Sequence, residues 1–233
     1  MNIAIIPARG GSKRIPRKNI KDFNGIPIIA YSIKAAVQSG CFDRVIVSTD
    51  DLEIAEVAKR YGAEVPFIRP PEVSDDYATT ADVIIHAVNW LEEEGTLVNY
   101  VCCLYATAPF IEVSDIQTTY QMLIEEPEAD YCFPVCEFPF PVQRGVKLTT
   151  GNRVEMFQAE HFNTRSQDLE PGYHDIGQFY WGKPSAYKNN IPMFSQRAIA
   201  FPISRKRVVD LDTPDDWEYA LMVSKLLTGA IKC

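Results

Sequence analysis

The segment IAIIPARGGSKRIPRKN, residues 3–19, determines which fold the sequence predicts. Its apolar run at 3–6 predicts a buried first strand, and two glycines follow almost directly. In open α/β sheets, ligands bind beyond the carboxyl ends of the strands. Paired glycines let the backbone approach a ligand closely, and successive N–H groups can surround an anion. Gly10, Gly11 and Ser12 are therefore candidate phosphate-binding residues.

Positive charge is concentrated in the same segment. Although the chain has a net charge of -8, six cations precede its first acid, Asp22: Arg9, Lys13, Arg14, Arg17, Lys18 and Lys21. This segregation indicates a polyanionic ligand, and a triphosphate fits well. A solvated basic loop or a localisation or RNA-binding patch would carry the same charge, but the position after a buried strand favours a nucleotide site. The segment matches neither the G-x-G-x-x-G fingerprint nor the P-loop pattern.

Short apolar runs alternate with amphipathic segments along most of the chain. We expect strands at 3–6, 44–48, 65–68, 100–105, 131–136, 178–181, 199–203 and 207–211. We expect helices at 27–37, from the caps at 49–51 to about 61, from the capping box at 79–82 to about 94, from that at 114–117 to about 124, after Pro184, and at 214–227. This order predicts one α/β domain over 1–233, a three-layer, mostly parallel, doubly wound sheet of about six or seven strands.

The helical period disappears between about 138 and 176. Apolar runs at 142–148 and 154–157 flank the polar sequence Thr149-Thr150-Gly151-Asn152, which predicts a hairpin. We interpret this segment as a small β-hairpin excursion from the main domain.

Composition excludes several classes of protein. With 46% hydrophobic and 23% charged residues, the chain is typical of a folded protein, and its negative net charge argues against a broad nucleic-acid surface. The longest uncharged run, 95–111, is too short for a membrane helix. The amino-terminal apolar run has no basic leader before it, and the six cysteines form no CxxC pair. We expect a cytoplasmic protein that binds neither membrane nor nucleic acid.

The sequence 5–20 closely resembles the opening signature of the CMP-sialic acid synthetase family, which includes a pseudaminic acid branch. The resemblance covers nearly the whole chain and recurs at 47–50, 69–72, 104–109 and 210–214. The sequence Tyr105-Ala106-Thr107-Ala108-Pro109 replaces the Gln-Pro-Thr-Ser-Pro that is usual in CMP-sialic acid synthetases, and it matches the pseudaminic branch. The resemblance implies a Rossmann-like nucleotidyltransferase that uses CTP and a divalent metal, Mg²⁺. It also assigns nucleotide-binding roles to Arg9, Ser12, Lys18, Asn19, Arg69, Tyr105 and Thr107, with Lys18 catalytic.

Two carboxylates near the carboxyl terminus are candidate metal ligands. Asp210 and Asp212 alternate on a predicted strand end, so both would face one side and could share a hard cation. Capping of the helix that starts at Pro214 would explain Asp212 or Thr213 without a metal, but it explains Asp210 less well. The resemblance makes both aspartates metal ligands and catalytic residues.

Residues 163–181 resemble the acceptor-binding part of the pseudaminic branch. A guanidinium can hold a carboxylate with two parallel hydrogen bonds, so Arg165 is our candidate for the sugar-acid carboxylate. His174, Gln178 and Tyr180 are candidates for other sugar contacts, although residues 179–181 would also suit a core strand and His174 a loop. The excursion resembles the dimerisation segment of the family, which implies a homodimer.

The resulting hypothesis is an enzyme that transfers CMP from CTP to the anomeric hydroxyl of a nonulosonic acid, with pseudaminic acid preferred. N-acetylneuraminic, legionaminic or 3-deoxy-manno-octulosonic acid are alternative acceptors. A nicotinamide-dependent reductase would need the glycine fingerprint that is absent here. A non-catalytic nucleotide- or RNA-binding module would leave Asp210 and Asp212 unexplained.

Overall fold

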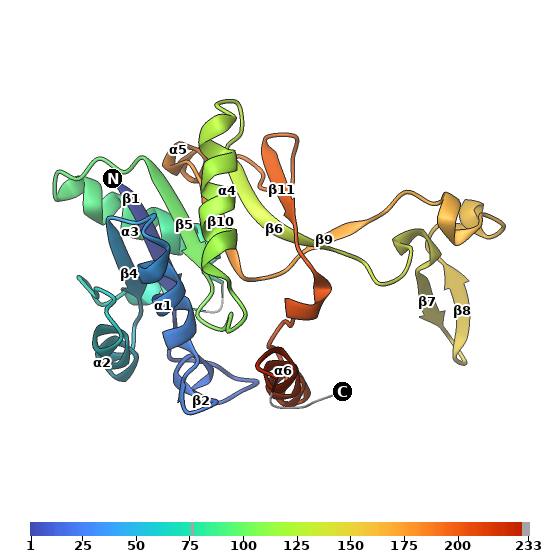
Figure 1. Cartoon of the computed structure of the whole chain (residues 1–233), viewed down its shortest axis with the longest axis horizontal. Coiled ribbons are helices and arrows are strands. Elements are labelled where there is room, and N and C mark those ends of the chain that lie inside the picture. The colour runs from blue at the N-terminus through green and yellow to red at the C-terminus, as the bar shows by residue number, and fades with distance from the viewer. Residues whose placement is uncertain (76, 230–233) are drawn as a thin grey trace.

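The computed structural model describes residues 1–75 and 77–229, and its centre is a seven-stranded sheet (Figure 1). Across the sheet the strands are ordered β11 (Ala198–Pro202), β6 (Tyr131–Glu137), β10 (Phe179–Gly182), β5 (Tyr100–Leu104), β1 (Asn2–Pro7) and β4 (Arg44–Ser48), and β9 (Tyr173–Asp175) also pairs with β6. The pairs β1–β4, β1–β5 and β11–β6 are parallel, whereas β10 and β9 run antiparallel to their neighbours. The expected mostly parallel sheet is confirmed.

Helices cover both faces of this sheet because alternate strand residues point to opposite sides. Ala4 and Ile6 pack on the face covered by α1 (Ile29–Ser39), α2 (Leu52–Arg60) and α4 (Val113–Glu125). Ile3 and Ile5 pack on the other face, against α3 (Thr80–Glu93) and α5 (Pro184–Lys188). The three-layer doubly wound architecture is therefore as predicted.

Short polar side chains fix where several helices begin. The Asp51 carboxylate accepts from the N–H groups of Glu53 and Ile54, which makes it the N-cap of α2. Thr79 and Asp82 form the expected capping box at α3. At α6 (Pro214–Leu227) the same box is formed by Thr213 and Asp216. Thr213 rather than Asp212 thus caps the last helix.

A separate apolar cluster ties the glycine-rich loop to the carboxyl-terminal helix. Ile15 and Phe23, near the short β2 (Asp22–Phe23) and β3 (Ile26–Pro27), are buried against Leu211 and Trp217. The Phe23 and Trp217 rings meet edge to face with centroids 5.6 Å apart. This cluster brings the amino-terminal cations beside the segment that carries Asp210 and Asp212.

Two expected strands are absent from the described residues, and both predictions were wrong. Residues 65–68 leave the sheet after a single bridge between Ile46 and Glu64, since Pro66 has no N–H to donate to a ladder. In the expected strand 207–211, Arg207 ends a short 3₁₀ helix, Arg205–Arg207, and forms ion pairs with Glu112 and Asp115 instead of joining the sheet.

Two helix starts also differ from the prediction. α1 begins at Ile29, because Pro27 pairs with Asp22 in the β2–β3 ladder. α4 begins at Val113, with no side-chain hydrogen bond from its N-cap residue Glu112. The expected capping partner Gln117 donates to the Ser39 carbonyl at 2.9 Å, so it stabilises contact with α1 instead.

The excursion extends away from the main sheet (Figure 1). Its hairpin pairs β7 (Val146–Thr149) with β8 (Arg153–Met156), and Gly151 and Asn152 at the turn adopt φ of 76° and 56°. The chain then returns through β9, so the excursion ends directly beside β6. Within the part of the chain that the structure describes, no helix combines the length and apolar character needed to span a bilayer.

Candidate active site

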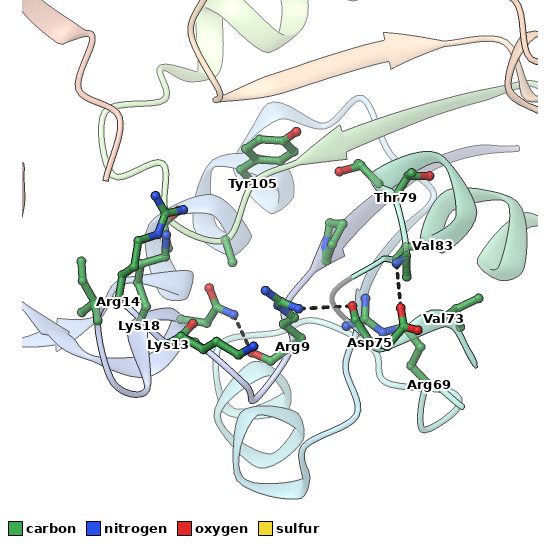
Figure 2. Close-up of a pocket in the computed structure, with 18 residues that line it drawn as sticks. Arg9, Lys13, Arg14, Lys18, Arg69, Val73, Asp75, Thr79, Val83 and Tyr105 are labelled. Atoms are coloured by element: carbon green, nitrogen blue, oxygen red, sulfur yellow. Dashed lines mark hydrogen bonds between the residues drawn. The ribbon is translucent and has the colours of Figure 1, made fainter. Parts of the chain in front are cut away.

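A cavity of about 490 Å³ lies beyond the ends of β1 and β5 (Figure 2). Its volume is within the range of small-molecule sites. The nucleotide-binding candidates that line it are Arg9, Ser12, Lys18, Asn19, Arg69, Tyr105 and Thr107. The structure thus brings together side chains from three separate segments of the sequence, near 9–19, at 69 and at 105–107, at the edge predicted for the ligand.

The backbone N–H groups around Gly10 and Gly11 form contacts within the protein. The Gly10 N–H donates to Asp50 Oδ1 at 2.9 Å, and the Ser12 N–H donates to the Gly10 carbonyl at 3.0 Å. Neither Gly10 nor Gly11 lines the cavity. Two of the three N–H groups of the expected cradle, those of Gly10 and Ser12, are thus bonded within the protein, and Ser12 lines the cavity.

Close packing explains why Gly10 is small. A Cβ on Gly10 would lie 2.7 Å from Asp51 Oδ2, whereas a Cβ on Gly11 would meet nothing within 4 Å. Asp51 cannot move aside easily, because it caps α2 and also binds the Arg17 guanidinium. Arg17 lowers the pKa of the Asp51 carboxyl through this hydrogen bond. Gly10 therefore serves the packing of the loop against α2.

Five cations line the cavity: Arg9, Lys13, Arg14, Lys18 and Arg69. Arg69 is only 4% exposed, and burial together with the nearby positive charge of Arg9 lowers its pKa, while Asp50 opposes the change. Its Nε donates to the Ser74 hydroxyl at 3.1 Å. A bound anion would relieve the repulsion between Arg69 and Arg9, which is the charge pattern of an anion site.

Asn19 is a buried residue that holds the backbone of the basic loop. It is 8% exposed, and its Nδ2 donates to the Arg9 carbonyl at 2.9 Å. Because this bond fixes the backbone at Arg9, Asn19 positions a cavity cation in addition to lining the cavity.

The carboxylates Asp210 and Asp212 lie between this cavity and a second one. Asp212 accepts two hydrogen bonds from Arg14, at 2.8 and 2.9 Å, and its Oδ1 is 3.6 Å from Lys18 Nζ. Asp210 lines the second cavity, and its pKa is raised by burial and by the like charge of Asp212. Where a strand was expected, Lys18 anchors this segment by donating to the Leu211 carbonyl, between the two aspartates.

The second cavity, of about 480 Å³, is bordered by β6, β9 and the segment 205–210. The sugar-binding candidates His174 and Tyr180 line it, and Tyr105 lines both cavities. The Tyr180 hydroxyl donates to Asp175 Oδ2 at 2.6 Å, and burial raises the pKa of Tyr180. Polar groups on rigid strands therefore face a space that adjoins the cationic cavity.

Two sugar-binding candidates lie outside both cavities. Gln178 is 3% exposed and its Nε2 donates to the Arg207 carbonyl at 3.0 Å, so it braces the segment 205–210. Arg165 is exposed on the excursion and pairs with Asp168 at 2.7 Å. Within one chain, Arg165 does not meet the other candidates.

Several residues of the site were not assigned from the sequence. Lys13 and Arg14 were counted only as part of a basic segment, although both line the first cavity. Asp175 and Arg205 line the second cavity. The alternation Tyr173-His174-Asp175 was a usable signal for β9, but the partner strand and the 3₁₀ turn at Arg205 have no local sequence signature.

Comparisons with known proteins agree with this geometry. The cytidylyltransferase family model matches residues 3–225. The chain is 44% identical to the pseudaminic acid cytidylyltransferase of Campylobacter jejuni, with 97% of both proteins covered. It is 30% identical to the CMP-N,N'-diacetyllegionaminic acid synthase of Legionella pneumophila, with 92% of both covered. A solved CMP:2-keto-3-deoxy-manno-octonic acid synthetase complexed with CTP has the same fold, with a TM-score of 0.71, 18% identity and 99% of both chains covered.

Proposed function

The chain belongs to the cytidylyltransferase family, and from that premise we propose that it transfers CMP from CTP to the anomeric hydroxyl of pseudaminic acid, releasing pyrophosphate. The observation that carries the proposal is the 44% identity with the Campylobacter jejuni enzyme over 97% of both chains. The adjoining cavities support it, because a nucleotide and a sugar acid need separate volumes that meet at the reacting atoms. Other nonulosonic acids are alternative acceptors, because the chain is also similar, at lower identity, to a relative named for legionaminic acid.

We assign CTP to the first cavity. Its five cations suit a triphosphate, and their charge would stabilise the negative charge that builds up on the leaving pyrophosphate. Lys18 is positioned for this role by its contacts with both Leu211 and Asp212. Because these groups are held by the fold before the ligand binds, they cost little reorganisation during the reaction.

Mg²⁺ is the proposed metal, and Asp210 and Asp212 would hold it. Magnesium is commonly bound by one or two carboxylates together with substrate phosphates. The raised pKa of Asp210 beside Asp212 is the electrostatic condition that a bound cation relieves. Among the described residues, no three His, Cys, Asp or Glu side chains are placed so that they could hold one metal ion together, so phosphate and water would complete the coordination. The ion would neutralise phosphate charge during transfer.

The sugar acid is assigned to the second cavity. Tyr180 fixes the Asp175 carboxylate by a hydrogen bond, and Asp175 with His174 can orient hydroxyl or acetamido groups. Asp210 lines this cavity while Asp212 contacts the cations of the other one. The anomeric hydroxyl and the α-phosphate would therefore meet beside this carboxylate pair.

We further propose a homodimer formed through the excursion. A two-stranded hairpin is marginal alone, and exposed apolar clusters are typical of interaction surfaces. The exposed apolar residues of this segment include Val146, Leu148, Val154, Phe157 and Phe162. A dimer would give Arg165 a route to the neighbouring subunit's site. Analytical ultracentrifugation should show monomers for Leu148→Glu, and an unchanged dimer would disprove the assignment of this surface.

The proposed compartment is the cytoplasm. Among the described residues, five cysteines are free, and four of them are buried, as expected where thiols stay reduced. The net charge of -8 supports small anionic substrates held by a local basic site rather than nucleic acid as a partner.

Incubation with CTP, Mg²⁺ and pseudaminic acid tests the proposed reaction. We expect pyrophosphate and the CMP-sugar in equal amounts, with no product when the sugar acid is left out. Parallel reactions with N-acetylneuraminic, legionaminic and 3-deoxy-manno-octulosonic acids identify the acceptor. Turnover of one of those acids alone would replace the proposed substrate, and no sugar-dependent pyrophosphate with any of them would refute the proposed function.

A further inference from the structure

The second cavity presents a problem of charge for a sugar acid. Glu137, Asp175 and Asp210 all line it, so a substrate carboxylate would enter beside three acidic side chains. Unpaired like charges at short range are strongly unfavourable when partly desolvated. The Mg²⁺ proposed at Asp210 would offset only one of these charges, so binding of a sugar acid favours a cationic side chain elsewhere in this cavity.

Arg205 is the sole arginine or lysine among the described residues that line the second cavity. It also borders an adjoining hollow formed with Cys136 and Pro139. Burial raises the pKa of the Cys136 thiol, and the positive charge of Arg205 opposes that rise. The Arg205 guanidinium is therefore close enough to Cys136 on β6 to influence that thiol electrostatically.

His174, the other basic residue of this cavity, is poorly suited to an anion. Its Nδ1 lies 2.7 Å from the Asp175 carbonyl oxygen. Because a carbonyl only accepts hydrogen bonds, Nδ1 must carry the proton in this contact. That proton is therefore engaged by the backbone and is not available to a substrate carboxylate.

The backbone that carries Arg205 is well anchored. Arg207, two residues later, contacts Asp115 on α4 at 2.8 Å and the N-cap residue Glu112 at 3.1 Å. The Arg207 carbonyl accepts from the buried Gln178. The guanidinium of Arg205 thus projects from a braced turn, as a specific ligand contact requires.

We propose that Arg205 binds the carboxylate of the sugar acid, an inference that rests on the function proposed above. A guanidinium can hold a carboxylate through two parallel hydrogen bonds, which also fixes the orientation of the sugar. Arg205 supplies this contact from the same chain that forms the cavity. Arg165, assigned to the carboxylate from the sequence, pairs with Asp168 on the excursion.

The test compares Arg205→Gln with Lys206→Gln, an exposed neighbour that lines neither cavity. We expect Arg205→Gln to raise KM for the sugar acid about 10- to 100-fold, with KM for CTP unchanged. Lys206→Gln should leave both constants unchanged. Arg205→Lys should recover only part of the loss, because an ammonium cannot form the paired hydrogen bonds.

A neutral ligand identifies the group that Arg205 contacts. Calorimetry should show that wild-type protein binds pseudaminic acid more tightly than its methyl ester, and that Arg205→Gln binds the two with similar affinity. Equal discrimination by wild type and Arg205→Gln would overturn the inference, and loss of discrimination in Arg165→Gln instead would return the role to Arg165. An inactive wild type would refute the proposed function, whereas an active enzyme that is insensitive to Arg205 would refute this inference alone.

Discussion

Lys18 Nζ donates a hydrogen bond to the Leu211 carbonyl oxygen at 2.7 Å, which joins the basic loop to the segment between the two candidate metal ligands. The same ammonium lies 3.6 Å from Asp212 Oδ1. The Lys18 side chain thus holds the cations of the first cavity close to the segment that carries Asp210 and Asp212. The cationic loop and the acidic segment form a single unit although they are far apart in sequence.

Replacement of Lys18 by alanine should slow turnover about 10²-fold, because a preorganised charge beside the triphosphate is lost. We also expect roughly 1–2 kcal/mol lower stability, since a charged hydrogen bond to the backbone disappears. Lys21→Ala is the matched control, because Lys21 lies over the Trp217 ring, 4.5 Å from its centroid, and does not line the cavity. Steady-state kinetics with CTP measures the turnover of both variants. Equal turnover in Lys18→Ala and Lys21→Ala would contradict this role for Lys18.

Alanine at Gly10 and at Gly11 should have different effects. The added Cβ at Gly10 would press against Asp51, so we expect a loss of about 1–3 kcal/mol and a higher KM for CTP. The same change at Gly11 meets open space and should leave the melting temperature close to that of the wild type. Thermal denaturation of the two variants makes the comparison, and equal melting temperatures would rule out the packing explanation.

Asp210→Asn should weaken catalysis and slightly stabilise the metal-free protein. A raised pKa means that the folded state disfavours the ionised carboxylate. This penalty is fully present above the raised pKa and disappears as the pH falls below the ordinary carboxyl value, so the gain in melting temperature should be seen at neutral pH. We expect about 10²-fold lower Mg²⁺-dependent turnover. A destabilised variant at neutral pH would contradict the sign of this effect.

Thr213→Ala and Asp212→Asn should separate capping from catalysis. Thr213 accepts from the Asp216 N–H, so its loss should cost about 1 kcal/mol of stability. Asp212→Asn leaves that cap intact and removes only exposed ion pairs, which contribute little to stability. Its Mg²⁺-dependent turnover should nevertheless fall strongly. Chemical denaturation and kinetics on both variants measure the two effects, and full activity in Asp212→Asn would remove it from the site.

Pseudaminic acid should be used in preference to N-acetylneuraminic acid, whose tail ends in a hydroxyl where pseudaminic acid ends in a methyl. An apolar pocket rejects an added hydroxyl by only about 10²-fold, so the preference should be clear but incomplete. The ratio of kcat/KM for the two acids at saturating CTP measures it. Equal or better use of N-acetylneuraminic acid would change the substrate while leaving the family unchanged.

Local sequence patterns predicted the parts of this protein that local physics determines. The apolar run at 3–6 and the cap at Thr79 led to the correct strand and helix, because short apolar runs and polar caps act within a few residues. The expected strand at 207–211 failed because a distant contact, Arg207 with Asp115, determines that segment. Arg205 entered the site for the same reason, since its neighbours come from β6 and β9.

Tyr105 is shared by the two cavities, and this has a kinetic consequence. The proposed CMP-sugar product would contain a part of each substrate and would therefore occupy both spaces at once. A molecule of that kind cannot share the enzyme with either substrate, so product inhibition should be competitive toward both CTP and the sugar acid. Pyrophosphate, in contrast, fits only the cationic side and should compete with CTP alone.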